Sequence, residues 1–329
     1  MATLTLEAAR RLATDALIRC GTAAPAADST ARALVGAEAD GLKGHGLARV
    51  APYAAQVRAG KVVGDARVRV EHPRPGLAAV DAGHGFAYPA LDAALDLLPE
   101  MARRQGIAAA GIRRSHHCGA AGRPVEALAE QGCVALLFAN TPAAMAPWGG
   151  NRAVFGTNPL AFACPLPGRA SVVIDLALSK VARANIVGAA RRGEAIPEGW
   201  ALDAAGCPTT DAAAALDGTM VPLGDAKGTA LALMVEVLAA GLVGARYAAE
   251  ASSFLDAEGD PPGTGQLLIA LDATALSGDA PERFAVLAAS IEAQDGARLP
   301  GARRLALRAR AEAEGLSVPD ALVAEIEAL

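Results

Sequence analysis

Apolar residues recur at helical spacing near the start of the chain and alternate with polar residues further on. The first helical run holds Leu6, Ala9, Ala13, Leu17 and Cys20. Thr5 directly before this run and Gly21 directly after it are residue types that begin and end helices. A second helix is predicted over residues 29–41, with Ser29 or Thr30 as its cap. The chain therefore opens with a helical part.

From about residue 62 onward, β-branched residues and alternation predict strands between helices. Strands are predicted within 61–72, 76–88, 107–117, 133–140, 171–179 and 267–272, and helices over 89–106, 122–132, 227–245 and from 281 onward. The helix over 227–245 is apolar on every side and is expected to be the central buried one. Residues 141–168 hold five prolines and four glycines. Such a long irregular segment in a compact domain is usually functional or disordered, and its tryptophan and two phenylalanines favour a function.

Composition allows one large domain or two and argues against several classes of function. Of 329 residues, 53% are hydrophobic and 20% charged, so a large core is available. The net charge of −5 and the absence of a basic run argue against nucleic-acid binding. No apolar run reaches the roughly 18 residues that span a bilayer, so no membrane association is expected. Five scattered cysteines without a CxxC pair are typical of a reduced, cytoplasmic protein.

A histidine between two glycines marks the stretch "DGLKGHGLARVAPYAAQ", residues 40–56. The imidazole of His45 can give or take a proton near neutral pH. Four residues on, Arg49 offers a planar fork that suits a carboxylate. Pro52 indicates that a helix begins close by, and helix N-termini favour anions. The pattern predicts a pocket for an anionic substrate beside a proton donor; the alternative is a turn histidine without a role.

A second candidate loop, "RSHHCGAAG" at 114–122, runs into a helix that Pro124 opens. Its glycines would let a ligand approach the backbone closely, because they carry no Cβ. Adjacent histidines with one cysteine rarely converge on a single zinc ion, and no second Cys/His group has the spacing of a zinc site. We therefore expect a ligand-binding loop here and no metal.

Three further positions carry weaker signals. "FGTNP" places Thr157 beside Asn158, which Pro159 should hold extended; the alternative is a simple turn. Asp175 ends a strand, where a carboxylate can hold a ribose, orient a histidine or be structural. Lys227 begins the apolar helix and could meet a phosphate or remain a solvated cation. These residues alone indicate an enzyme with a His/Arg anion pocket and no more.

Glycine-rich nucleotide motifs are absent from the chain. No G-x-G-x-x-G follows a predicted strand, and there is neither a Walker A loop nor a G-x-S-x-G. The blocks that are present resemble, in order, the malate/L-lactate dehydrogenase family of NAD(P)-dependent oxidoreductases, whose fold is not Rossmann. These blocks are "DGLKGHGLARVAPY", "DAGHGFAY", "SHHCGAAG", "NTPAAMAPWGGNRAVFGTNPLAFACP", "VVIDLALSKVARANI", "IPEGWALDAAGCPTTD", "PLGDAKGTALALMVEVLAAGLVGA" and "RLPGARR".

Within that family, "GHGLARV" and the "HHCG" loop are most similar to reductases of Δ1-piperideine-2-carboxylate and Δ1-pyrroline-2-carboxylate, which form L-pipecolate and L-proline. The resemblance implies His45 as the proton donor, Arg49 on the substrate carboxylate, and Tyr53 and Thr157 beside the substrate. It implies a nicotinamide cofactor, NADPH with NADH as the alternative, and no metal. The implied cofactor residues are His117, Cys118, Gly119, Ala120, Ala121, Asp175, Leu176, Ala177, Gly224, Lys227, Arg298, Pro300 and Gly301. The alternative activity is a 2-keto acid/2-hydroxy acid dehydrogenase of malate or lactate type.

The expected fold is α/β, with a non-Rossmann mixed-sheet cofactor domain over 76–279. A helical, dimerising domain is expected from 1–75 together with 280–329, and the resemblance implies a homodimer. The chain departs from the family where Gly44 replaces a common serine, so a Ser–His relay is absent. Asn185, Asp225 and Ala302 also differ from the residues that are common in the family, at positions that the resemblance places near the cofactor. Two other interpretations are a non-catalytic anion binder and a Schiff-base enzyme using Lys227.

Overall fold

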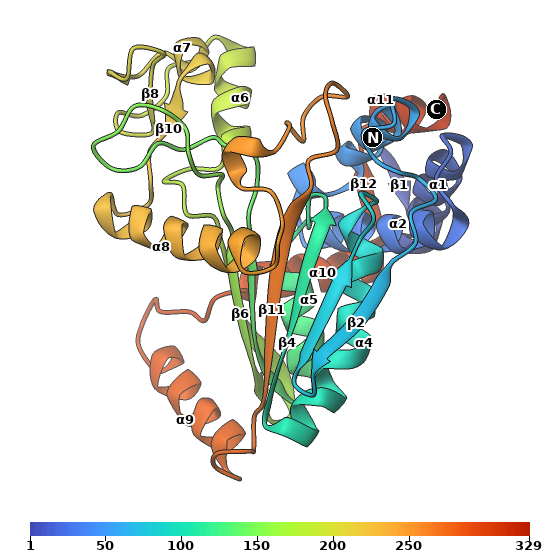
Figure 1. Ribbon diagram of the computed structural model, residues 1–329, viewed down its shortest axis with the longest axis vertical. Coiled ribbons are helices and arrows are strands. Elements are labelled where there is room, and N and C mark those ends of the chain that lie inside the picture. The colour runs from blue at the N-terminus through green and yellow to red at the C-terminus, as the bar shows by residue number, and fades with distance from the viewer.

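The computed structural model describes residues 1–329 as helices around one large mixed sheet, with two small sheets beside it (Figure 1). The α-helices are α1 (Leu6–Arg19), α2 (Ala24–Ala39), α3 (Val50–Arg58), α4 (Ala87–Gln105), α5 (Gly122–Glu130), α6 (Arg183–Arg192), α7 (Ala212–Asp217), α8 (Ala226–Glu236), α9 (Ala280–Glu292), α10 (Ala302–Glu314) and α11 (Asp320–Glu327). The strands are β1 (Ala2–Leu4), β2 (Arg69–Arg74), β3 (Leu77–Asp81), β4 (Ile107–Ser115), β5 (Cys133–Ala139), β6 (Leu160–Leu166), β7 (Arg169–Leu176), β8 (Ala201–Leu202), β9 (Pro208–Thr209), β10 (Thr219–Met220), β11 (Thr264–Asp272) and β12 (Leu316–Val318).

The central sheet has seven strands in the order β2-β3-β4-β11-β5-β6-β7. Only β3 and β4 run parallel, and every other neighbouring pair is antiparallel. β11 comes late in the chain yet lies between β4 and β5. A Rossmann domain has a doubly wound, mostly parallel sheet instead. The prediction of an α/β fold with a non-Rossmann mixed sheet is therefore confirmed.

Helices cover both faces of this sheet. α4 packs on β4 and β11, and α5 packs on β5, β6 and β7. A π-helical turn, Val237–Gly241, extends α8 and contacts β11, while α9 packs on β6 (Figure 1). Neighbouring residues of β11 point to opposite faces: Leu268 joins the main core with α4 and α5, and Leu267 joins a smaller core with α8.

The two ends of the chain meet in a helical group. α1, α2, α3 and α11 pack together, and β1 pairs with β12 (Figure 1). Thr5 caps α1 as predicted, since its hydroxyl accepts a hydrogen bond from the Ala8 amide at 3.1 Å. The predicted cap of α2 is wrong: the helix begins at Ala24, and Pro25 in its first turn favours that earlier start. Ser29 and Thr30 therefore lie inside α2.

Two segments that were predicted within the helical domain contact the sheet. β2 lies before residue 75 but pairs with β3, and α9 lies after residue 280 but packs on β6. The domain division at these boundaries stays a prediction. α6, α7 and the three-stranded sheet β10-β8-β9 form a small lobe with its own core, which includes Ile186 and Met220. The small lobe and the helical group stand at the same end of the central sheet (Figure 1, upper left and upper right).

The prediction of a central buried helix over 227–245 is wrong. α8 ends at Glu236, and Leu231, Leu233 and Met234 on it are exposed. Because the helix is apolar on every side, its sequence does not reveal which side packs against the sheet. In the structure the side that carries Ala232 is buried in the smaller core, and the opposite side is exposed. None of the helices in the structure is both long enough and apolar enough to cross a membrane.

Candidate active site

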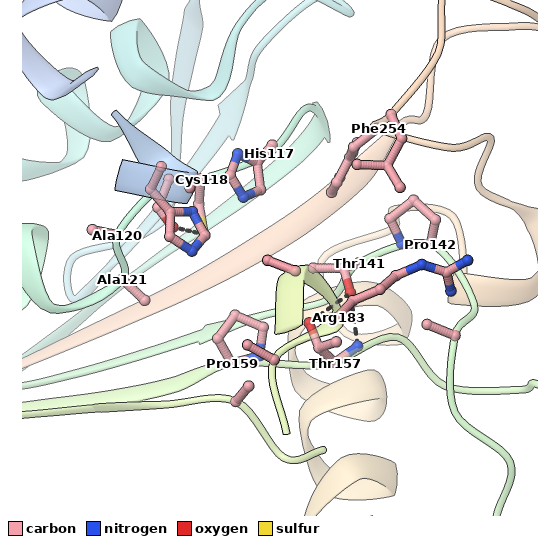
Figure 2. Close-up of a pocket in the computed structure, with 18 of the residues that line it drawn as sticks. His117, Cys118, Ala120, Ala121, Thr141, Pro142, Thr157, Pro159, Arg183 and Phe254 are labelled. Carbon is pink, nitrogen blue, oxygen red and sulfur yellow. Dashed lines mark hydrogen bonds between the residues drawn. The ribbon is translucent and has the colours of Figure 1, made fainter. Parts of the chain in front are cut away.

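A cavity of about 360 Å³ lies between the helical group, the end of the central sheet and the small lobe. Segments that are far apart in the sequence line it (Figure 2). The lining residues are Gly44, His45 and Arg49; 117–121; 141–144; Thr157 and Pro159; Asp175 and Ala177; 182–184; and 253–255. The cavity thus joins the two loops that the sequence singled out, which lie within residues 40–56 and 114–122.

The loop of His45 consists of two 3-10 turns, Lys43–His45 and Leu47–Arg49, which lead into α3. Glycine is suited to each of the two positions beside His45 for a different physical reason. A Cβ on Gly44 would meet nothing within 4 Å, so this position leaves open space beside the imidazole. A Cβ on Gly46 would lie 2.1 Å from Oε2 of Glu38. That buried carboxylate accepts a hydrogen bond from the Leu47 amide at 3.0 Å and fixes the loop.

Arg49 presents its guanidinium group to the cavity. Its Nε donates to the carbonyl oxygen of Gly44 at 2.7 Å, which orients the group. It forms no ion pair with any carboxylate of the chain, so its two terminal NH2 groups are available to an anion. This arrangement suits a substrate carboxylate.

Two imidazole rings stack beside Arg49. The rings of His45 and His117 have centroids 5.1 Å apart and are inclined by 14°. Nδ1 of His117 is hydrogen bonded to the Tyr53 hydroxyl at 2.8 Å, and that hydroxyl is bonded to the Tyr88 hydroxyl at 3.1 Å. Nδ1 of His45 is buried and has no partner in the protein. His117 is therefore held from behind, whereas His45 retains a free ring nitrogen.

Burial controls the charge of both rings. Burial first and the nearby Arg49 cation second lower the pKa of His45 to about 4. The pKa of His117 is also well below its usual value, because burial and then Arg49 disfavour its charged form. Burial raises the pKa of Tyr53 to about 12, so its hydroxyl stays protonated. At neutral pH the pocket therefore holds two neutral imidazoles and a cationic arginine.

Tyr53 was predicted beside the substrate but does not line the cavity. Its side chain is fully buried behind His117, because α3 turns its face toward the core at this position. Thr157 does line the cavity, and its amide donates to the Thr141 hydroxyl at 2.9 Å. Asn158 is not extended as predicted: its φ is +40°. Its side-chain amide donates to Ala232 and to buried Glu236, and these bonds favour the unusual conformation.

The predicted cofactor loop, residues 117–121, lines the cavity across from Thr157 (Figure 2). The loop leads into α5. Its small residues Gly119, Ala120 and Ala121 leave room for a ligand against the backbone. Asp175 at the end of β7 also lines the cavity, and its carboxylate accepts from the Gly122 amide at 2.7 Å. Burial raises the pKa of Asp175 above its usual range. A small-residue wall beside a helix N-terminus and a carboxylate fits a dinucleotide.

Six of the predicted cofactor residues do not line the cavity. They are Leu176, Gly224, Lys227, Arg298, Pro300 and Gly301. Leu176 follows Asp175 in strand β7 and points to the other side of the strand. Gly224 and Lys227 stand at the start of α8, and Gly301 directly precedes α10. Their predicted contacts with a cofactor stay predictions.

Several lining residues were missed by the sequence interpretation. Arg183 begins α6 and has a buried Nε without a partner; Figure 2 shows it on the side of Pro142 and Thr157. Phe254 packs on His117, with ring centroids 5.4 Å apart. Thr141 follows the buried strand β5, at the start of the irregular segment, which was a usable signal. Nothing local distinguishes Arg183 or Phe254 from other residues of their types.

The side chains of this structure do not form a metal-binding site of the usual composition. It contains no group of three or more His, Cys, Asp or Glu side chains that could hold a metal ion. Burial raises the pKa of the Cys118 thiol to about 12, so it stays protonated and is a poor nucleophile at neutral pH. In the "SHHC" segment, only His117 and Cys118 reach the cavity.

Comparisons with known proteins identify the family of the chain and its fold. The pattern of the malate/L-lactate dehydrogenase family matches residues 4–327. The chain is 50% identical, over 99% of its length and 97% of the relative's, to a (2R)-3-sulfolactate dehydrogenase (NADP(+)) of Chromohalobacter salexigens. It is 41% identical, over 100% of its length and 99% of the relative's, to a Δ1-pyrroline-2-carboxylate/Δ1-piperideine-2-carboxylate reductase of Pseudomonas aeruginosa. The solved Δ1-piperideine-2-carboxylate reductase of Pseudomonas syringae superposes with a TM-score of 0.94 at 37% identity, covering 100% of this chain and 99% of that one.

The family match and the named relatives show that this non-Rossmann chain is an NAD(P)-dependent oxidoreductase. The chain belongs to the malate/L-lactate dehydrogenase family, as predicted. The predicted likeness to imino acid reductases is confirmed, and the higher identity to a sulfolactate dehydrogenase adds a second kind of relative.

Proposed function

We propose that this chain reduces C2 of a small 2-oxo or 2-imino acid with NADPH, and catalyses the reverse oxidation. The observation that carries this proposal is the meeting of Arg49, His45 and His117 in one cavity with the small-residue loop 117–121. A nicotinamide dinucleotide bound along that loop and Asp175 would supply the hydride. NADPH is preferred over NADH because the 50% identical relative is named for NADP(+).

Arg49 would bind the substrate carboxylate and fix the position of C2. Orientation of this kind can account for a large part of the rate enhancement. Thr157, on another wall of the same cavity, would contact the substrate from the side opposite the histidines. Tyr53 would act indirectly, because a hydroxyl that donates to Nδ1 of His117 leaves the ring proton of His117 on Nε2.

His45 would deliver the proton to the substrate heteroatom. The neutral ring must first gain a proton, since its pKa is lowered to about 4 by burial and by Arg49. A carboxylate paired with Arg49 cancels that positive charge and raises the pKa of His45. Substrate binding would therefore recruit the proton that the reaction uses.

The substrate class favoured by the cavity is a 2-oxo acid with a second anionic group. Arg49 and Arg183 both line it, and neither forms an ion pair within the chain. A single carboxylate occupies one guanidinium group, which leaves the other without an anion. The 3-sulfolactate named for the 50% identical relative carries both a carboxylate and a sulfonate. We therefore infer interconversion of 3-sulfopyruvate and 3-sulfolactate, or of a substrate with the same pair of charges.

Cyclic imino acids are the second candidate substrates. They are the compounds named for the relatives at about 40% identity, and they carry one carboxylate for Arg49. In that case Arg183 would meet a cofactor phosphate rather than the substrate. A 2-oxo acid with an anionic group on C3 needs a second cation in the cavity, whereas a cyclic imino acid needs room for its ring. The two substrate classes can therefore be distinguished by their kinetics.

An initial-rate panel tests both proposals. The substrates are 3-sulfopyruvate, pyruvate, Δ1-pyrroline-2-carboxylate and Δ1-piperideine-2-carboxylate, each with NADPH and with NADH. We expect kcat/KM for 3-sulfopyruvate to exceed that for pyruvate by about tenfold or more, as one well-placed charged hydrogen bond contributes roughly 1.5–3 kcal/mol. Arg183→Leu should remove this preference and change the pyruvate rate little. If Arg183→Leu instead raises the KM for NADPH and slows every substrate equally, Arg183 belongs to the cofactor site and the imino acids become the favoured class.

We also infer a homodimer located in the cytoplasm. The exposed apolar residues on and after α8 (Leu231, Leu233, Met234, Val237 and Leu242) form a surface of the kind that subunit contacts cover. All five cysteines are free, which suits a reducing compartment. Analytical ultracentrifugation should give twice the chain mass; a monomer at micromolar concentration would contradict the dimer.

A further inference from the structure

Phe254 forms an aromatic wall of the cavity. Its ring lies 4.9 Å from that of His116 and 5.4 Å from that of His117, and only 7% of the residue is exposed. It belongs to residues 252–262, which we call the strap. The strap contains no helix or strand and crosses from the end of the short turn Ala248–Glu250 to β11. Figure 2 shows Phe254 beside His117 and above Pro142.

The strap is held by side chains and not by its own backbone. No residue from 252 to 262 takes part in a backbone–backbone hydrogen bond. Near the cavity it is fastened instead by two residues from the helical group. Nε2 of Gln56 donates to the carbonyl oxygens of Phe254 at 3.0 Å and Asp256 at 2.8 Å. Nζ of Lys61 donates to the carbonyl oxygen of Asp256 at 3.2 Å and to its Oδ1 at 2.9 Å.

Both fastening residues are deeply buried, which is costly for a lysine unless it is paired. Gln56 is fully buried on α3, and the Lys61 side chain has no exposed surface, whereas its partner Asp256 is half exposed. A fully desolvated amine that reaches only the strap indicates a specific role in placing that segment. The same helix carries Arg49 at its start and Tyr53 one turn on. Residues 49, 53 and 56 share one helical face.

We propose that Gln56 and Lys61 are positioning residues that set substrate specificity, because they hold Phe254 against the histidines and so fix the size of the cavity. α3 would then position three parts of the site together: Arg49, which would bind the carboxylate, Tyr53, which supports His117, and Gln56, which holds the Phe254 wall. The proposal rests on the proposed function only in taking this cavity as the substrate site. Bulky 2-oxo acids would be excluded by Phe254, and releasing the strap would admit them.

The test compares Gln56→Leu, Lys61→Met and Asp256→Asn with the direct variant Phe254→Ala. The matched control is Glu258→Gln, which makes the same acid-to-amide change in the strap at a side chain without a hydrogen bond. The first readout is the ratio of kcat/KM for 2-oxoisocaproate to that for pyruvate. We expect Phe254→Ala to raise this ratio by about tenfold or more, as steric discrimination in a pocket commonly provides. The three fastening variants should raise it in the same direction by about threefold or more, and Glu258→Gln should leave it unchanged.

The second readout needs no turnover: the rate at which diethyl pyrocarbonate modifies His117, followed by peptide mass spectrometry. Release of the strap should expose His117 and speed its modification in the fastening variants. If the wild-type protein reduces neither a 2-oxo acid nor a 2-imino acid, the proposed function fails; if it reduces only 2-imino acids, the substrate ratio cannot be measured. In both cases His117 modification still decides the role of the strap. Lower thermal stability with an unchanged substrate ratio and unchanged modification would show a purely structural role and overturn the proposal. Because Asp256 is half exposed, Asp256→Asn retains the fold if Lys61→Met does not.

Discussion

At the scale of single residues, the charge of the pocket depends on Arg49. This cation lies beside His45, His116 and His117, and in each case it contributes to a lowered pKa. The cavity is therefore suited to an anion, and a bound anion would raise the pKa of the nearby His45 ring, which is the proposed proton donor. Neutralisation of Arg49 by a bound carboxylate removes the second cause of the low pKa of His45, while burial, the larger cause, remains.

Replacement of His45 separates proton donation from positioning. His45→Ala should lower kcat for a 2-oxo acid by about 10²–10⁴-fold, the usual contribution of a general acid. Reduction of a cyclic iminium should suffer less, because its nitrogen already carries a proton. Steady-state kinetics on 3-sulfopyruvate and Δ1-pyrroline-2-carboxylate measure both losses. Equal losses would mean that His45 only positions the substrate.

His45 and Arg49 could be identified from sequence because they are close together in a short glycine-flanked loop. Their chemistry depends on local spacing, and the structure brings them together as that spacing suggests. Tyr53 continued the same spacing but faces the core, since the direction of a helical face depends on packing. Arg183 and Phe254 reach the cavity only through the tertiary fold, so no local pattern marks them.

At the scale of elements, α10 is fastened to α2 and α5 by buried ion pairs. Arg308 of α10 donates to Asp40, after α2, at 2.7 Å and to Glu126 of α5 at 2.7 Å. Arg123 and Arg304 complete the cluster. The Asp40 side chain has no exposed surface and that of Glu126 only 6%, so each depends on its partners. This cluster fixes the start of α5, where the 117–121 loop ends.

Arg308→Met should destabilise the protein by about 3–5 kcal/mol, because it leaves buried carboxylates without their main partner. Arg310→Met is the matched control on the same helix. Its pair with Glu314 is exposed and screened by solvent, so its loss should change the stability little. Urea unfolding measures the free energy of both variants. Similar losses would show that the buried cluster adds nothing beyond a surface pair.

Helix ends were predictable where a single residue determines them. Thr5 caps α1, and Gly106 follows α4 with a φ of +79°. The start of α2 was misplaced because the Ser29 hydroxyl pairs with Asp92, 63 residues away, and not with the helix end. α8 was predicted as buried because its sequence is apolar on every side, and periodicity cannot identify an uncovered face.

At the scale of the whole molecule, the order of the sheet lay beyond sequence patterns. Strand periodicity located β4, β5 and β11, but the insertion of β11 between the other two depends on long-range pairing. The alternation of apolar and polar residues along a strand is the same whichever strand lies beside it, so the pattern cannot identify the neighbouring strand. The non-Rossmann fold was foreseen through the family resemblance and the missing glycine motif.

Buried histidines make the stability of the fold depend on pH. Burial, then Arg49 and Lys61, lower the pKa of His116 to about 3, and neither of its ring nitrogens has a partner. The unfolded chain, with an imidazole pKa near 6.5, binds the proton first as the pH falls. The free energy of unfolding should therefore be fully retained above about pH 6.5 and decline from there toward pH 3, in proportion to the proton-binding difference.

His116→Phe should remove part of this decline, about 2 kcal/mol between pH 6.5 and 5 at about 1.4 kcal/mol per pKa unit. Its aromatic neighbours Tyr53, Phe86 and Phe254 can accommodate a phenyl ring. Urea unfolding at both pH values measures the change, and His72→Phe on exposed β2 is the control. An unchanged pH slope in His116→Phe would contradict this assignment.

The most direct test of the account is the substitution of Arg49 by lysine, with Arg58→Lys as the control. Arg49 directly precedes α3 and Arg58 is the last residue of α3, but Arg58 is exposed and donates to the carbonyl oxygen of the C-terminal residue instead of facing the cavity. Lysine retains the charge of Arg49 but not its two-pronged hydrogen bonding to a carboxylate. We predict a fall in kcat/KM of about 30-fold or more for Arg49→Lys with any 2-oxo or 2-imino acid that the enzyme reduces, which corresponds to roughly 2 kcal/mol or more. Arg58→Lys should stay within about twofold of wild type. Equal kcat/KM values for wild type, Arg49→Lys and Arg58→Lys would contradict the binding of the substrate carboxylate by Arg49, and with it the assignment of this cavity as the active site.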